Sequence, residues 1–140
     1  MDIKLDWKQG MSFSGSSENG SGFTVPLGTS AEFGGNEDGF RPMELMLIGM
    51  AGCTAMDVIS ILAKKRQVVD SFQVNVHADR SSEHPKVFTD IVVEYIFSGA
   101  DLEEAAAQRA VELSETKYCS GIAMLRKNSP IHTKITINKV

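Results

Sequence analysis

Two cysteines, Cys53 and Cys119, carry the most readily used chemistry in this 140-residue chain. A thiolate can attack an electrophile, ligate a soft metal ion or pair with a second thiol in a disulfide. The two thiols are 66 residues apart in the sequence. A disulfide requires the fold to bring their Cα atoms within about 4.4–6.8 Å of each other. From the residues alone, three interpretations stay open: inert core cysteines, a redox pair and a metal site.

A metal site is the least favoured of the three. The cysteines do not have the Cys-x-x-Cys spacing of a zinc site, and the three histidines do not cluster. His77 and His132 fall in predicted strands, and His84 falls in the loop after His77. The sequence therefore predicts no metal, and each histidine is expected to be a surface or strand residue.

The element that must position Cys53 is a predicted helix that begins at Pro42 and has its last turn at residues 64–66. Pro42 suits the first helical position, and Lys64, Lys65 and Arg66 suit the C-terminal turn. The residues between them are apolar almost all round, which predicts a helix buried within the protein. The one stripe of this helix with polar character contains Cys53 together with Met46, Gly49, Asp57, Ser60 and Lys64.

Cys119 is predicted to lie just ahead of a short helix that ends near residue 128. Free N–H groups at a helix start stabilise a thiolate, so this position predicts a lowered pKa for Cys119. The segment Asp101-Leu-Glu-Glu104 has a capping-box pattern, which predicts a preceding helix from there to about Glu115.

The remaining segments read as strands. Apolar residues alternate with polar ones over 3–8, and the pattern continues through Met11 and Phe13. Residues 28–40 lack periodicity and are expected to form an irregular loop. Further strands are predicted at 23–27, 72–80, 87–98 and 131–137, with 72–80 and 87–98 as an antiparallel pair. This order predicts an α+β fold with an antiparallel sheet, in a single domain over residues 1–140.

Composition excludes several partners and suggests a compartment. A formal net charge of −4 and a pI near 5.3 argue against nucleic-acid or anionic-membrane binding. The longest charge-free apolar stretch, residues 45–56, has 12 residues, whereas a membrane span needs about 20. No signal peptide is visible, so we expect a cytoplasmic protein whose thiols are kept reduced.

Two segments resemble the OsmC/Ohr family, and within it the YhfA-like branch. Arg41-Pro-Met-Glu-Leu-Met-Leu-Ile-Gly-Met-Ala-Gly-Cys-Thr-Ala-Met-Asp-Val is similar to the central-helix motif that carries a reactive cysteine. Lys117-Tyr-Cys-Ser-Gly-Ile-Ala-Met-Leu125 is similar to the segment that carries the second cysteine. The spacing of the motifs and the order of the elements also match, so the resemblance covers essentially the whole chain.

The resemblance implies an intertwined homodimer, with antiparallel sheets around long, buried central helices. It also implies a peroxidase active in oxidative-stress defence. Cys53 would attack a hydroperoxide, organic in preference to hydrogen peroxide, and become a sulfenic acid. Cys119 would then form a disulfide with Cys53, and an external dithiol would restore both thiols. No cofactor is implied beyond that reductant.

The sequence departs from the peroxidase pattern around the attacking thiolate. In peroxidase members a Glu ten residues before the cysteine holds an Arg from the N-terminal strands. Here Met43 occupies that position, Glu44 comes one residue later, and no arginine precedes Arg41. Arg41 and Glu44 are therefore the candidate supporting residues. The departure keeps a second function open: a non-catalytic or redox-sensing dimer that binds a small lipophilic molecule.

Overall fold

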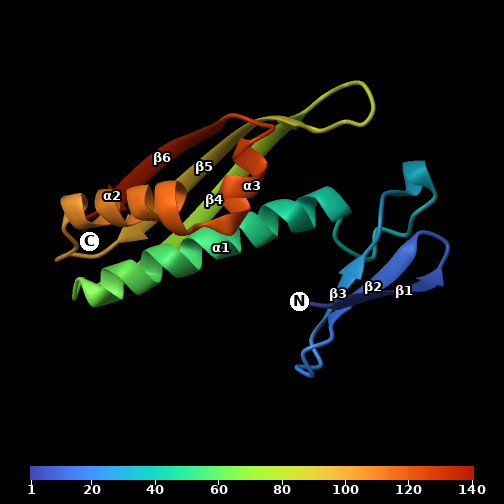
Figure 1. Cartoon of the computed structure of the whole chain (residues 1–140), viewed down its shortest axis with the longest axis horizontal. Helices are drawn as coiled ribbons and strands as arrows, with labels where there is room; N and C mark the ends of the chain where they lie inside the picture. The colour runs from blue at the N-terminus through green and yellow to red at the C-terminus, as the bar shows by residue number, and fades with distance from the viewer. The chain divides into compact units, whose positions relative to one another are not determined.

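The computed structural model describes residues 1–140, which divide into two compact units, residues 1–47 and residues 48–140 (Figure 1). Helix α1 (Pro42–Lys64) begins in the first unit and continues into the second. It begins at Pro42 as predicted, and it ends at Lys64, the first of the three basic residues predicted for its last turn. At its start, the backbone N–H of Arg41 donates to Glu44 Oε1 over 3.1 Å, which is one half of a capping box.

The first unit holds an antiparallel sheet of β1 (Ile3–Gln9), β2 (Ser12–Ser17) and β3 (Thr24–Leu27), in that order. The turn between β1 and β2 needs Gly10, whose φ of 51° lies in the left-handed region. The predicted loop over 28–40 is irregular apart from a single 3-10 turn, η1 (Ala31–Phe33).

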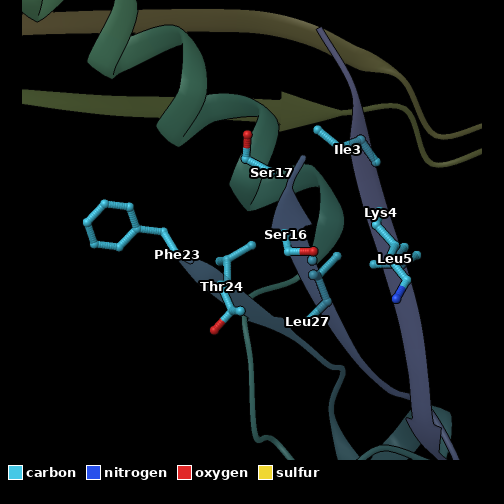
Figure 2. Close-up of a pocket in the computed structure, with 10 residues that line it drawn as sticks. Ile3, Lys4, Leu5, Ser16, Ser17, Phe23, Thr24 and Leu27 are labelled. Atoms are coloured by element: carbon cyan, nitrogen blue, oxygen red, sulfur yellow. The ribbon is translucent and has the colours of Figure 1, made fainter. Parts of the chain in front are cut away.

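Alternation along these strands gives the N-terminal sheet an apolar face. Leu5, Gly15 and Val25 are register partners across the three strands. The resulting groove has a volume of about 420 Å³. Figure 2 shows residues that line it, among them Ile3 and Leu5 from β1 and Leu27 from β3. The apolar side chains of this sheet face are therefore exposed when the chain is considered alone.

The second unit holds a mixed sheet in the order β4-β5-β6. Strands β4 (Ser71–Arg80) and β5 (Phe88–Ser98) pair antiparallel, as predicted. Strand β6 (Ile131–Asn138) pairs parallel to β5, so the prediction of a purely antiparallel sheet is wrong. The reason is the connection: the chain between β5 and β6 forms a helical crossover, which returns it to the starting end of β5.

That crossover contains α2 (Glu104–Leu113), a π-helical turn η2 (Ser114–Tyr118) and α3 (Ser120–Arg126). The predicted capping box at Asp101 does not form, since α2 begins three residues later with Glu103 before it and no side-chain cap. Leu102 is fully buried, and the segment around it forms a turn before the helix. The backbone N–H of Glu103 donates to the Gln67 side chain over 2.8 Å and not to a capping side chain.

One face of the mixed sheet forms the core. Strand β5 buries every second residue, namely Ile91, Val93, Tyr95 and Phe97. Helices α1, α2 and α3 lie on one side of the sheet (Figure 1). The opposite face is polar, with ion pairs such as Lys134–Glu94 at 2.9 Å. The core therefore lies between β5 and the helices.

Helix α1 buries only one stripe in a single chain: Met50, Thr54, Val58 and Leu62, which recur every four residues. Burial on all sides, as expected from the sequence, is not found within one chain. The opposite side is apolar and exposed; Met56, for example, is 76% exposed. By length and composition alone the helix could also cross a membrane, with a mean hydropathy of 2.0 over 18 residues. Core helices of soluble proteins meet the same criterion.

The close approach of α3 to α1 makes a prediction for Gly121→Ala. A Cβ at this position would lie 2.9 Å from the Met50 Cα, so one of the helices must shift. We expect unfolding free energy to fall by about 1–3 kcal/mol, measured as a lower urea midpoint. The matched control is Ser120→Ala, an exposed position in the same helix. A Gly121→Ala midpoint equal to that of the control would contradict the close packing.

Candidate functional site

Cys53, Asp57 and Cys119 meet in the second unit. Their two Sγ atoms and one carboxylate oxygen of Asp57 all lie within 4.8 Å of one another, and both cysteines are free thiols. Cys53 and Asp57 are one helical turn apart on α1, whereas Cys119 is the N-cap residue of α3. The structure thus brings together the two thiols that the sequence singled out.

The geometry of the pair depends on how closely α3 packs on α1. Gly121 has no side chain to separate its backbone from Met50, three residues before Cys53. Cys119 precedes Gly121 by two residues, and it therefore arrives beside the same face of α1. The pairing follows from two helices in contact and not from local sequence.

The two thiols differ in exposure and in electrostatics. Cys53 is half-buried, and Cys119 is only 3% exposed. The N–H of Ile122 donates to Cys119 Sγ over 3.4 Å, so the predicted position at a helix start is confirmed. The expected lowering of its pKa is wrong, however. Burial raises the pKa of Cys119 to about 11 and outweighs that N–H group, and the neighbouring Cys53 adds to the rise.

A chain of hydrogen bonds runs inward from Asp57. Ser114 Oγ donates to Asp57 Oδ2 (3.0 Å) and also bonds Thr54 Oγ1 (2.8 Å). The Tyr95 hydroxyl lies 2.8 Å from Thr54 Oγ1 and 3.0 Å from Glu115 Oε1, and its single proton is donated to one of these two oxygens. Burial raises the pKa of Tyr95 above its ordinary value, so it remains a neutral donor. The Oδ2 oxygen of Asp57 is thereby hydrogen-bonded within the protein.

A groove of about 400 Å³ reaches Asp57 from solvent. Ile61, Leu113 and Tyr118 give it apolar walls, while Lys64 and Lys65 place cations along it. A small molecule with an apolar body can therefore approach the carboxylate that neighbours both thiols.

The two candidate supporting residues lie at the start of α1. Arg41 Nε is 3.8 Å from Glu44 Oε1, and its guanidinium is 3.5 Å from Glu37. Both ion pairs are largely exposed. Glu44 thus caps the helix through the Arg41 N–H, and the Arg41 guanidinium forms exposed ion pairs with Glu44 and Glu37.

Several residues of the site were not predicted. Asp57 was placed on the Cys53 stripe, and its i, i+4 spacing from Cys53 was the signal that could have identified it. Ser114 and Thr54 gave no comparable signal, because their hydrogen bond joins residues 60 positions apart. The three histidines are exposed, as predicted, and two of them pair with Asp79 and Asp90.

Comparisons with known proteins identify the relatives of this chain. The family model described as OsmC-like protein matches residues 34–134. Protein YhfA of Escherichia coli K12 is 39% identical over 127 residues, which cover 91% of this chain and 90% of YhfA.

Solved structures have the same fold. A hypothetical protein from Aquifex aeolicus gives a TM-score of 0.84 at 29% identity, covering 98% of this chain and 95% of that one. An organic hydroperoxide resistance protein OsmC from Legionella pneumophila gives 0.71 at 14% identity, covering 96% and 95%. The second match, at this identity, concerns the fold alone.

The burial of Cys119 predicts a pH dependence that can be measured without substrate. In Cys53→Ser, ultraviolet absorbance of the Cys119 thiolate should appear well above the free-thiol pKa of about 8.5. Burial disfavours the charged form and survives the substitution, so the direction of the shift should persist. The unfolded variant in denaturant is the matched reference. A folded-state midpoint at or below that of the unfolded chain would contradict the buried environment.

Proposed function

Because the chain belongs to the OsmC-like protein family, we propose that it is a thiol peroxidase that reduces organic hydroperoxides. The observation that supports this most directly is the proximity of two free thiols, with sulfur atoms within 4.8 Å. Their exposure assigns the roles. Half-buried Cys53 is open to the oxidant and acts as the nucleophile, and buried Cys119 acts as the resolving thiol.

The reaction proceeds in two steps. The Cys53 thiol loses its proton, and the thiolate attacks the terminal oxygen of ROOH. The O–O bond breaks, and the departing RO⁻ takes up a proton to give the alcohol ROH. Cys53 is then a sulfenic acid. The Cys119 sulfur displaces its hydroxyl group, giving a Cys53–Cys119 disulfide and water. An external dithiol reduces the disulfide, and no cofactor takes part.

The raised pKa of Cys119 suits the resolving role. At neutral pH Cys119 is a thiol and does not compete with Cys53 for the oxidant. It also lies where only a neighbouring sulfenic acid reaches it, since its side chain is buried. The apolar walls of the groove beside Asp57 favour an organic hydroperoxide over hydrogen peroxide.

We further propose that the working unit is a homodimer in the cytoplasm. The exposed side of α1 carries Gly49, Gly52, Met56 and Ile59, which follow one another at helical spacing. Nothing in the chain lies within 4 Å of a Cβ built at either glycine, so a second helix can approach closely there. A second copy would cover this stripe. The apolar groove of the N-terminal sheet offers a further surface for it.

A redox-sensing or small-molecule-binding dimer is the alternative. It is favoured by one observation: Arg41 is paired with Glu37 and Glu44 at the start of α1. In this function the groove would bind a lipophilic ligand, and the thiols would report oxidation without rapid turnover.

The peroxidase proposal predicts the fate of both thiols. Fully reduced protein given one equivalent of an organic hydroperoxide should lose two thiols and about 2 Da per chain. Hydrogen peroxide should react more slowly. Cys53→Ser should abolish the fast reaction, and Cys119→Ser should retain it but stop at the sulfenic acid. Intact mass and thiol titration over time measure all of these.

An exposed serine supplies the matched control, because Ser21→Ala removes no thiol and lies outside the groove beside Asp57. Oxidation no faster than that of free cysteine would overturn the peroxidase proposal. Survival of ligand binding in Cys53→Ser would then favour the alternative.

The dimer proposal predicts that Met56→Glu dissociates the protein. A buried, unpaired carboxylate should raise the dimer dissociation constant by at least about a hundredfold, roughly 2.7 kcal/mol. Sedimentation equilibrium measures it. Val87→Glu makes the same change at an exposed apolar residue outside α1 and should remain dimeric. A wild-type protein that sediments as a monomer would contradict the proposal.

A further inference from the structure

We propose that the reduced Cys53–Asp57–Cys119 cluster is also a binding site for a borderline-soft divalent cation, Zn²⁺. The three side chains offer two thiolate sulfurs and one carboxylate oxygen, all within 4.8 Å of one another. This is a ligand set that Zn²⁺ prefers, with Zn–S near 2.3 Å and Zn–O near 2.0–2.2 Å. Ligand atoms around a tetrahedral Zn²⁺ are about 3.5 Å apart, so small side-chain rotations would complete the site.

The outer hydrogen bonds already orient two of these ligands. Ser114 Oγ donates to Asp57 Oδ2 (3.0 Å), which leaves the other carboxylate oxygen available. Ser114 is in turn fixed by Thr54 (2.8 Å). The Ile122 N–H donates to Cys119 Sγ (3.4 Å), as backbone N–H groups do to metal-bound thiolates. Metal ligands in proteins are held by such outer partners, and here they are part of the fold.

Three protein ligands leave a fourth position. The groove beside Asp57 connects that carboxylate with solvent, so it provides an entry path and room for a water ligand. Lys64 and Lys65 line the groove as well, and their charge disfavours a free cation along it. Affinity must therefore come from the two sulfurs. For this reason we expect Zn²⁺ to bind and Mg²⁺ or Ca²⁺, which prefer oxygen ligands, to be rejected.

Binding would act as a regulator of the same two thiols, a consequence that rests on the proposed peroxidase function. Each cysteine that ligates Zn²⁺ as a thiolate releases its proton to solvent, so binding releases up to two protons. Both sulfurs are then occupied, and neither can attack an O–O bond or form the disulfide. Oxidation to the disulfide conversely removes the metal ligands. Metal and peroxide are thus mutually exclusive at this site.

Co²⁺ provides a direct probe, because its bonds to thiolates give ultraviolet charge-transfer bands. Reduced protein titrated with Co²⁺ should show such bands, saturating at one equivalent per chain, and Zn²⁺ should displace them. Cys53→Ser and Cys119→Ser should each lose intensity. Asp57→Asn should lower the Co²⁺ affinity at least about tenfold, because even the loss of an outer-shell partner lowers metal affinity by that factor. Asp101→Asn, at an exposed aspartate, is the matched control and should bind like the wild type.

Wild-type protein oxidised to the disulfide should give no band, which tests the site without relying on the folding of any variant. Absence of a charge-transfer band in reduced wild type, or a band unchanged in both cysteine variants, would overturn the inference. Peroxide turnover is measured separately in metal-free protein with a chelator. Turnover without Co²⁺ binding would overturn the metal site alone, and Co²⁺ binding without turnover would overturn the peroxidase alone.

Discussion

The Thr54 hydroxyl is the contact on which the second unit depends. It is fully buried on α1, and it bonds both Tyr95 of β5 and Ser114 of η2, each over 2.8 Å. A buried hydroxyl without partners would be costly, so these bonds fix the rotation of α1 about its axis. That rotation turns Thr54 into the core and Asp57 toward Ser114 (3.0 Å). The reactive residues are therefore positioned by their buried neighbours.

The same rotation divides α1 into three faces with different roles. The stripe through Thr54 packs on the chain's own sheet, and the opposite stripe through Met56 is exposed and apolar. Cys53 lies between these two, half-buried. A small molecule can reach a residue in this intermediate position, while apolar surroundings still exclude much of the water. A helix that is apolar nearly all round is thus reconciled with a chemically accessible cysteine.

Local patterns predicted the elements well and their assembly less well. The start of α1 followed from Pro42 and its approximate end from the basic residues at 64–66, and the β4–β5 pair followed from alternation, because these signals act between near neighbours. The direction of β6 depends on a crossover of about thirty residues, which no strand pattern encodes. The two cysteines were identified as a possible pair, but their proximity depends on Gly121 packing against Met50, a contact between distant segments. The raised pKa of Cys119 likewise follows from burial that only the assembled fold produces.

The parallel crossover has a consequence for the order of folding. Cys119 lies inside the segment between β5 and β6, which packs on α1 at Gly121 and ends where β6 pairs with β5. Such long-range parallel pairing carries a high loop-closure cost and is intrinsically slow. The residues of α1, β4 and β5 all precede Cys119 in the chain, so the contacts of the local β4–β5 hairpin carry a lower closure cost than the pairing of β6.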